Sequence, residues 1–363
     1  MLTGLETRRG FLGQQVQEGP RKWGLYSHPL ESKNTSDEFE GFIPGTFGYH
    51  PKMGCYPDLH NHLFGNTMQP IPPDVTEWIR KVFRECNERI TGKLSNNPNL
   101  PEESLDLTWI EHLSQYASPV TLTSLWTIKI ETHYLGGLRH FRNWEIADIG
   151  VLMFFRQAGA LKRSKVALLQ SKRLYPSNNT VQEEDRIDYE IGFARLADPE
   201  SLQQSVAVEA EFQFDDDCRY GALAAGSEQV KAIADYEKQN KTPIYYQFYN
   251  PWRLPFTQRI PLSQFKRPTG KLSLGTRVIP AREVHKVLAR YVAGQKPTLA
   301  ELKSLCPKAP FGWSLEHFVA DLMLGCIQGS IFRDISEQRI QNLFYRRSGP
   351  ISAAIAISIE APE

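Results

Sequence analysis

The sequence predicts an α/β fold, with α+β as the alternative. Two apolar runs, residues 147–155 and 165–174, flank a polar segment that contains a glycine, which is the pattern of a β-hairpin with a loop of roughly eight residues. Further along, the helical pattern of residues 226–240 leads into an aromatic, strand-like segment at 243–251. A helix that feeds a buried strand is half of a βαβ unit, so we expect strands and helices to alternate in the middle of the chain.

The other elements follow from their periodicity. Residues 75–90 carry apolar side chains at helical spacing, and residues 105–116 repeat that pattern. Residues 120–134 are compatible with a helix or a strand. Ser227 is placed to cap the helix over 226–240. We expect further elements as follows: a strand over 206–214, helices over 183–193, 297–303, 314–327 and 335–345, and a final strand over 351–359.

Proline and polar residues gather near residues 100 and 260 and suggest a division into three parts. Residues 1–100 form an irregular N-terminal arm, rich in glycine, proline and aromatics, together with a helix. Residues 101–260 form the core. Residues 261–363 form a mostly helical C-terminal region that ends in a strand.

Composition narrows the function classes. The 363 residues are 41% hydrophobic and 23% charged with a net charge of +1, so any nucleic-acid surface must be a local patch. The five cysteines contain no closely spaced pair, which argues against a zinc ribbon and indicates reduced thiols in a cytoplasmic protein. No apolar run approaches roughly 18 residues, so we expect no membrane partner.

Two polar interruptions of apolar runs carry the predicted chemistry. Asp148 interrupts the first strand of the hairpin, and Gln170 and Lys172 share one face near the end of the second. A carboxylate and an amide oxygen can bind Mg²⁺ or Mn²⁺, which polarises a phosphate and lowers the pKa of a bound water. A lysine beside the ion would position that water and stabilise negative charge on the phosphate.

Asp148 followed by Gln170-Ser-Lys172 resembles the PD-(D/E)xK nuclease superfamily, in the Gln-x-Lys variant of Mrr-like restriction endonucleases. The resemblance implies a mixed central sheet flanked by helices, with both motifs on adjacent strands. In this chain the core would carry an N-terminal and a C-terminal extension. It also implies a metal-dependent endonuclease acting on DNA, less often RNA, and a setting in defence against foreign nucleic acid.

The superfamily often adds an acid from a preceding helix, and two residues are candidates here. Glu145 shares a segment with Asp148 and is the preferred third metal ligand beside Asp148 and Gln170. In a regular strand, however, residues three apart face opposite sides, so Glu131 stays open as the catalytic acid.

Basic residues near the motifs suggest a rim that binds phosphate, with ordinary solvated loops as the alternative. They are Lys162, Arg163, Lys165, Lys172 and Arg173, preceded by Arg139, His140 and Arg142. The flanking regions are expected to bind a partner protein or a second copy of the chain.

Other polar and aromatic groups have simpler readings. Asp215–Asp217 is typical of a solvated turn, with a metal site as the alternative. Glu209 and Glu211 alternate on one strand face, which we expect to be exposed and which could add an acid to the nuclease site. The aromatics from Tyr245 to Trp252 read as core, with base stacking as the alternative.

Two other functions remain open. The first is a non-enzymatic interaction or scaffold subunit with a degenerate nuclease core. A glutamine at position 170 leaves fewer negatively charged ligands for a metal ion than a second acid would. A zinc-dependent hydrolase is the second, because His60 and His62 would present two imidazoles on one strand face.

Overall fold

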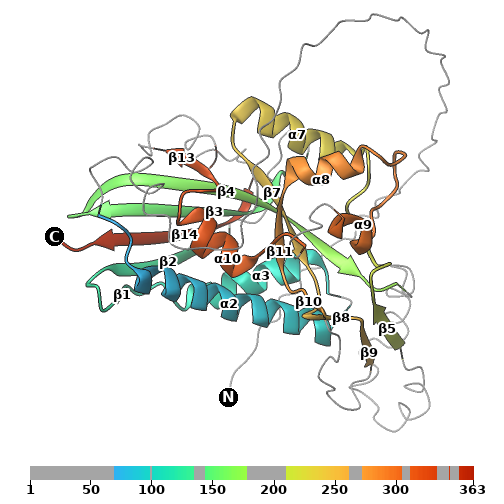
Figure 1. Cartoon of the computed structure of the whole chain (residues 1–363), viewed down its shortest axis with the longest axis horizontal. Coiled ribbons are helices and arrows are strands. Elements are labelled where there is room, and N and C mark those ends of the chain that lie inside the picture. The colour runs from blue at the N-terminus through green and yellow to red at the C-terminus, as the bar shows by residue number, and fades with distance from the viewer. Residues whose placement is uncertain are drawn as a thin grey trace, which may run out of the picture. The chain divides into compact units, whose positions relative to one another are not determined.

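The computed structural model describes residues 69–98, 100–134, 144–177, 210–260, 272–304, 311–332, 343 and 351–363. All of them belong to one compact unit, Cys55–Glu363. They form a mixed sheet with helices on both faces (Figure 1), which confirms the predicted α/β class and the mixed central sheet.

The main sheet has the strand order β1-β2-β14-β3-β4-β7-β11-β12, and β6 and β13 pair with β4 outside this path. Its pairs are antiparallel except β14 with β3 and β4 with β7, which are parallel. The strands are β1 (Val120–Thr121), β2 (Thr127–Tyr134), β3 (Ala147–Gln157), β4 (Ala160–Tyr175), β6 (Arg219–Tyr220), β7 (Ile244–Tyr249), β11 (Arg277–Pro280), β12 (Trp313–Ser314), β13 (Ser330–Phe332) and β14 (Ile351–Ala361). Two small antiparallel ladders pair β5 (Ala210–Phe214) with β9 (Phe256–Ile260) and β8 (Arg253–Leu254) with β10 (Leu272–Ser273).

The predicted hairpin is β3 and β4, but its turn is much shorter than expected. Two residues, Ala158 and Gly159, connect the strands, and both have positive φ, as a type I′ turn requires. The polar residues expected in a loop instead extend the strands at their exposed end. The register pairs Ile149 with Leu169 and therefore places Asp148 opposite Gln170.

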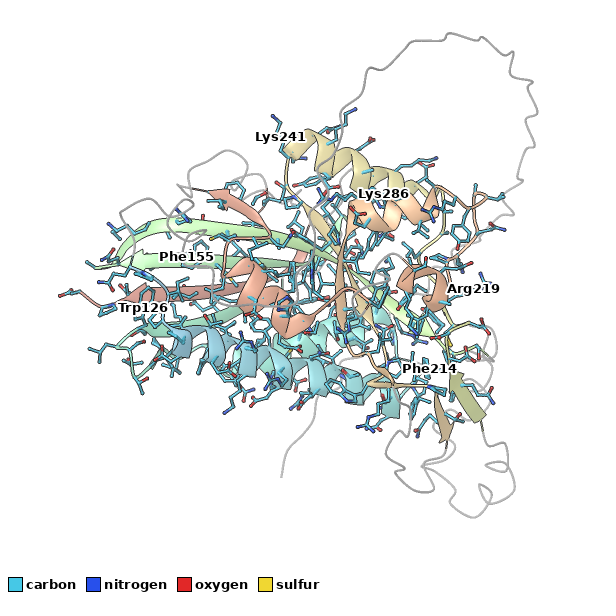
Figure 2. The ribbon with its side chains drawn as sticks, viewed as in Figure 1. Trp126, Phe155, Phe214, Arg219, Lys241 and Lys286 are labelled. Atoms are coloured by element: carbon cyan, nitrogen blue, oxygen red, sulfur yellow. The ribbon has the colours of Figure 1, made fainter. Side chains whose placement is uncertain are left out.

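Helices cover the two faces of the sheet and enclose two cores. On one face α2 (Pro73–Asn96), α3 (Glu102–Ser114), α10 (Leu315–His317) and the π-helix η2 (Phe318–Met323) pack over residues such as Val151 and Ile355. On the other face α7 (Glu228–Asn240), α8 (Ala281–Leu288) and α9 (Leu299–Lys303) pack over residues such as Leu168 and Tyr246. Figure 2 shows Phe155 and Trp126 at the hairpin end of the sheet and Phe214 at the opposite end.

Strand β14 comes from the end of the chain yet lies inside the sheet. It runs antiparallel to β2 and parallel to β3, and so it separates these two strands. Its side chains are largely buried, which explains the apolar, β-branched pattern of the sequence. The division of the chain into three parts remains a prediction.

Helix ends follow the sequence signals in part. Ser227 accepts a hydrogen bond from the Val230 N–H at the start of α7, as expected, and Thr298 forms a capping box with Glu301 at α9. The helix predicted over 314–327 is replaced by the short α10 and the π-helix η2. No helix within the described residues is long and apolar enough to cross a membrane.

Candidate active site

The two strands of the hairpin bring Asp148 and Gln170 into contact. The Gln170 amide Nε2 donates to the Asp148 carboxylate over 2.6 Å, and the Ser171 backbone N–H donates to the same oxygen over 2.5 Å. Asp148 lies at the start of β3 and is partly buried, whereas Gln170 is 2% exposed. The cross-strand register thus assembles the first half of the predicted site.

Lys172 lies on the same face as Gln170 and meets a carboxylate that the sequence did not suggest. Its ammonium is 3.4 Å from Glu102 Oε2, and the side chains of Lys172 and Glu102 are only 3% and 17% exposed. The other carboxylate oxygen, Glu102 Oε1, accepts a hydrogen bond from the Arg173 N–H over 2.9 Å. Glu102 is the first residue of α3, so the N-terminus of this helix abuts the end of β4.

The end of strand β4 offers backbone donors that account for the position of the Asp148 and Glu102 carboxylates. Strand β3 begins at Ala147, so the last residues of β4 extend beyond it. The N–H groups of Ser171 and Arg173 point toward the same edge, where the neighbouring backbone has ended. Asp148 and Glu102 accept these two donors. Buried backbone donors need partners, and here carboxylates supply them.

Glu145 lies near the cluster without a direct hydrogen bond to Asp148 among the described contacts. It precedes β3, and its backbone carbonyl accepts a hydrogen bond from Gln229 Nε2 of α7 over 3.4 Å. Burial, followed by the negative charge of Glu103, raises the pKa of the Glu145 carboxyl, and Lys172 opposes the shift. Glu145 is therefore an electrostatic neighbour of the site.

The structure does not bring Glu131 to this site, so this candidate is corrected. Glu131 lies on β2, and its carboxylate pairs with Lys129 over 2.9 Å. Strand β14 stands between β2 and β3, and Glu131 is in register with Ala356, which pairs with Leu152 rather than with Asp148. Two inter-strand spacings, roughly 10 Å, and about four residues of strand, roughly 13 Å, separate Glu131 from Asp148.

A buried polar network lies behind the site, on the α3 face of the sheet. The Ser171 hydroxyl donates to Asp106 Oδ1 over 2.6 Å, and the Tyr249 hydroxyl donates to the same oxygen over 2.5 Å. The Gln247 amide in turn donates to the Tyr249 hydroxyl. No local pattern of the sequence marks Asp106 or Ser171 as functional, and both are buried polar residues in the structure.

Burial has the largest effect on the carboxyl groups of the site, and the charges of neighbouring carboxyl groups add to it. Burial, followed by the charge of Asp106, raises the pKa of Asp148 well above its usual range, and Lys172 opposes the shift. Burial also raises the pKa of Asp106 to about 7, against the hydrogen bonds from Ser171 and Tyr249. Negative charges that lie close together and away from solvent favour the binding of protons or cations at this site.

The predicted phosphate-binding rim is not assembled, and this expectation is wrong for the residues that the structure describes. Lys162 lies near the hairpin turn, ten residues along β4 from Lys172, or roughly 33 Å at 3.3 Å per residue. The Lys165 ammonium is buried and donates to the Met323 carbonyl over 2.6 Å, and the Arg173 guanidinium donates to the Leu100 carbonyl.

The remaining candidates fall into two groups. Tyr245, Tyr246, Phe248 and Tyr249 are buried, as expected for core aromatics, and Asp215–Asp217 forms a turn in which the Asp217 N–H bonds to the Asp215 carboxylate. Outside the described residues lie His60, His62, Arg139, His140, Arg142 and Glu209, and the side chain of Glu211 is likewise not described.

The donor set fits a divalent cation held by oxygen atoms. Gln170 Oε1 is buried and has no hydrogen-bond partner, and it belongs to the amide that contacts Asp148. Carboxylates and amide carbonyls are ligands of Mg²⁺ and Mn²⁺. Within the described residues no three His, Cys, Asp or Glu side chains are grouped to hold an ion, so neutral oxygens and water would complete its shell.

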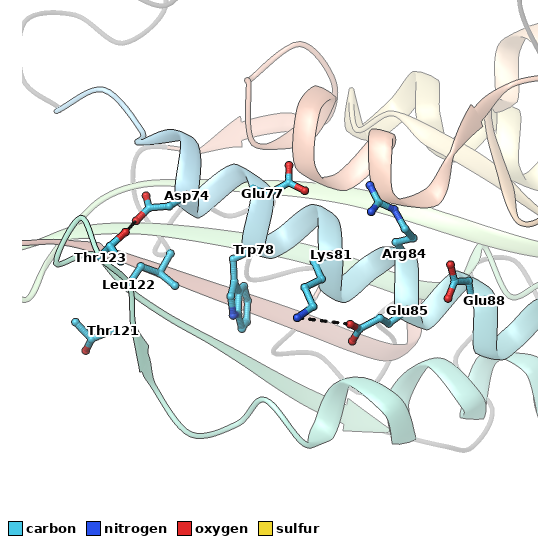
Figure 3. A pocket seen from close by; sticks show the side chains of 10 residues that line it. All are labelled: Asp74, Glu77, Trp78, Lys81, Arg84, Glu85, Glu88, Thr121, Leu122 and Thr123. Carbon is cyan, nitrogen blue, oxygen red and sulfur yellow. Dashed lines mark hydrogen bonds and ion pairs between the residues drawn. The ribbon is translucent and has the colours of Figure 1, made fainter.

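A separate surface groove lies along the outer side of α2 and shares no residue with this site (Figure 3). Several of its charged groups have local partners: the Asp74 carboxylate accepts hydrogen bonds from Thr123 and Ser124, and Lys81 lies 4.0 Å from Glu85. The groove is lined by Asp74, Glu77, Trp78, Lys81, Arg84, Glu85, Glu88, Thr121, Leu122 and Thr123.

No family model, curated protein or solved structure matches this chain.

Proposed function

We propose that this chain is a metal-dependent nuclease that hydrolyses phosphodiester bonds, with DNA as the favoured substrate and RNA as the other. One observation supports it above all: Gln170 contacts Asp148 across adjacent strands, with Lys172 two residues further on the same face. Glu102 of α3 adds a second carboxylate beside Lys172.

The residues have distinct roles in this proposal. Asp148, Glu102 and the free oxygen of Gln170 would hold Mg²⁺ or Mn²⁺, and Glu145 would add negative charge nearby. The ion, when bound, polarises the scissile phosphate and lowers the pKa of a water molecule. That assignment replaces Glu131 as the additional acid.

Lys172 would act on the substrate. Its ammonium is nearly buried and is held by Glu102, so it is oriented before substrate arrives. From there it can donate a hydrogen bond to a phosphate oxygen and stabilise the charge that builds as water attacks phosphorus. The P–O bond to the leaving oxygen breaks, and that oxygen takes a proton from solvent.

A biological setting in defence against foreign DNA, within the cytoplasm, is part of the proposal and rests on the motif resemblance. The three described cysteines, Cys86, Cys218 and Cys326, are free and buried, which suits a reducing compartment. A partner protein or a second copy of the chain would bind the flanking regions.

The proposal is tested with linear DNA, circular DNA and RNA, each incubated with Mg²⁺, Mn²⁺ or EDTA. Wild type is compared with Asp148→Ala and Lys172→Ala, and with Glu131→Gln as a matched control on β2. We expect metal-dependent cleavage that both alanine variants lose and the control retains. Cleavage that survives both alanine substitutions would contradict the proposal.

A second candidate is a non-enzymatic interaction subunit with a degenerate nuclease core. The observation that favours it is that no three His, Cys, Asp or Glu side chains in the described part of the chain are grouped so that they could hold a metal ion. Folded protein that neither cleaves any of the three substrates nor binds Mn²⁺ would support this candidate.

A further inference from the structure

Ser171, the middle residue between Gln170 and Lys172, contacts carboxylates on both sides of the sheet. Its backbone N–H donates to Asp148 over 2.5 Å, and its hydroxyl donates to Asp106 over 2.6 Å on the face covered by α3. Adjacent residues of a strand point to opposite faces, so Ser171 cannot reach the substrate side with its side chain. It links the two sides instead.

We propose that Asp106 is a positioning residue of this site, which through Ser171 fixes the end of β4 and thereby the alignment of Asp148, Gln170 and Lys172. The proposal rests on the proposed function, because the site it positions is the metal-binding site. Asp106 touches neither substrate nor metal; its action on the site passes through Ser171.

The network is specific to this part of β4. Asp106, Ser171, Gln247 and Tyr249 are all buried, and their hydrogen bonds converge on Asp106 Oδ1 or on the Tyr249 hydroxyl that bonds to it. Replacing a buried ionic network by well-packed apolar side chains of similar size is often neutral or stabilising, so stability alone does not require a buried carboxyl group at Asp106. A network that converges on Asp106 and includes Ser171 is therefore better explained by positioning than by stability.

Helix α3 connects the two halves of the arrangement. Glu102 and Asp106 are four residues apart and lie on the same helix face. Asp106 bonds to Ser171, and Glu102 meets Lys172 and the Arg173 N–H. One helix thus contacts three successive residues of β4, and loss of the Asp106 contact would let the helix and the strand shift relative to each other.

The test measures Mn²⁺ affinity by calorimetry, together with kcat and KM for DNA cleavage. The network variants are Asp106→Ala, Asp106→Asn and Tyr249→Phe, the last of which removes a single hydroxyl. Asp148→Asn is measured beside them and shows whether Mn²⁺ binding depends on Asp148. Thr108→Ala is the matched control, because Thr108 is a buried polar residue of α3 whose hydroxyl bonds to Lys93 of α2 rather than to β4. Thermal unfolding of every variant is followed in parallel.

Outer partners of metal ligands typically change metal affinity or activity by about 10–100-fold. We expect Asp106→Ala to weaken Mn²⁺ binding and lower kcat by about tenfold or more with little change in KM, and Asp106→Asn, which retains an acceptor oxygen, to recover part of the loss. Tyr249→Phe should act in the same direction with a smaller effect. Thr108→Ala should lower the melting temperature without changing Mn²⁺ affinity.

Two outcomes would overturn the inference in distinguishable ways. If wild type binds Mn²⁺ through Asp148 and the three network variants bind it equally well, the positioning role fails and the proposed function stands. If no Mn²⁺ binding depends on Asp148, the proposed function fails and the positioning role fails with it.

Discussion

The Lys172 ammonium lies 3.4 Å from the Glu102 carboxylate, and both groups are largely withdrawn from solvent. One partner comes from the Gln-x-Lys segment of β4, and the other from the first turn of α3, 70 residues earlier in the chain. Because the same carboxylate also accepts the Arg173 N–H, this pair joins helix to strand at the place where Asp148 and Gln170 meet.

Removing the charge of Glu102 should destabilise the fold. Glu102→Gln leaves the Lys172 ammonium without its carboxylate but retains a hydrogen-bond acceptor, so we expect a loss of about 1–3 kcal/mol in the free energy of unfolding. Urea denaturation at pH 7 measures it. Glu131→Gln, which alters an exposed carboxylate on β2, should change stability by less than about 0.5 kcal/mol. Equal effects of the two substitutions would show that the buried pair of Lys172 and Glu102 stabilises the fold no more than an exposed pair does.

Stability should fall as pH rises from about 4 to 7. The pKa of Asp106 is raised by burial from 3.8 to about 7, so in this window the folded protein binds more protons than the unfolded chain. The contribution of the neutral Asp106 carboxyl to the free energy of unfolding is fully present below pH 4. It is lost as the pH rises through the pKa that Asp106 has in the folded protein. Asp106→Asn, which is neutral at every pH, should give a flatter profile between these limits.

The pH prediction is checked by urea denaturation of wild type and Asp106→Asn at pH 4, 5, 6, 7 and 8. A single such group changes the slope by at most about 1.4 kcal/mol per pH unit. A wild-type profile that is flat or rises across the window, or a variant with an unchanged slope, would refute the assigned direction of the Asp106 shift.

Mn²⁺ should stabilise the folded protein at pH 8 more than at pH 5, because protons compete with the ion for the carboxylates. At a concentration ten times its dissociation constant the expected gain is about 1.4 kcal/mol. Asp148→Asn should abolish the gain, and Glu131→Gln should retain it. Thermal unfolding with and without Mn²⁺ measures the effect, and a gain that persists in Asp148→Asn would place the ion elsewhere.

Lys165 should contribute to the stability of the fold and not to the binding of nucleic acid. Its buried ammonium donates to the carbonyls of Met323, the last residue of η2, and of Gln328 in the segment that follows, and burial lowers its pKa to about 8. Lys165→Met leaves these carbonyls without their donor, so we expect a loss of about 1–3 kcal/mol per unpaired group. DNA affinity, measured by fluorescence anisotropy, should be unchanged, and a clear drop would restore Lys165 to a phosphate-binding role.

The sequence predicted the centre of the site because the signals there are local. Asp148, Gln170 and Lys172 each interrupt an apolar run, and strand alternation together with hairpin pairing suffices to bring Asp148 to Gln170. The predicted turn was too long because polar residues at the exposed end of a hairpin resemble a loop, while Ala158 and Gly159 alone make the connection.

The errors and omissions arise from contacts between distant segments. Glu131 would lie near Asp148 only if β2 were the neighbour of β3. Strand β14, more than 200 residues further along the chain, lies between them. Glu102 went unnoticed because acids in the first turn of a helix usually complement the helix dipole. The contact between Asp106 and Ser171 forms only when α3 packs on β4, and no local sequence pattern predicts that contact.

The most direct test of the central claim is the first-order rate of Mg²⁺-dependent DNA cleavage by Asp148→Asn, compared with wild type and with Glu131→Gln under identical conditions. We expect Asp148→Asn to lose on the order of 10³-fold in rate, about 4 kcal/mol of transition-state stabilisation, and Glu131→Gln to stay within about twofold of wild type. An Asp148→Asn variant that is folded and cleaves DNA at the wild-type rate would contradict it.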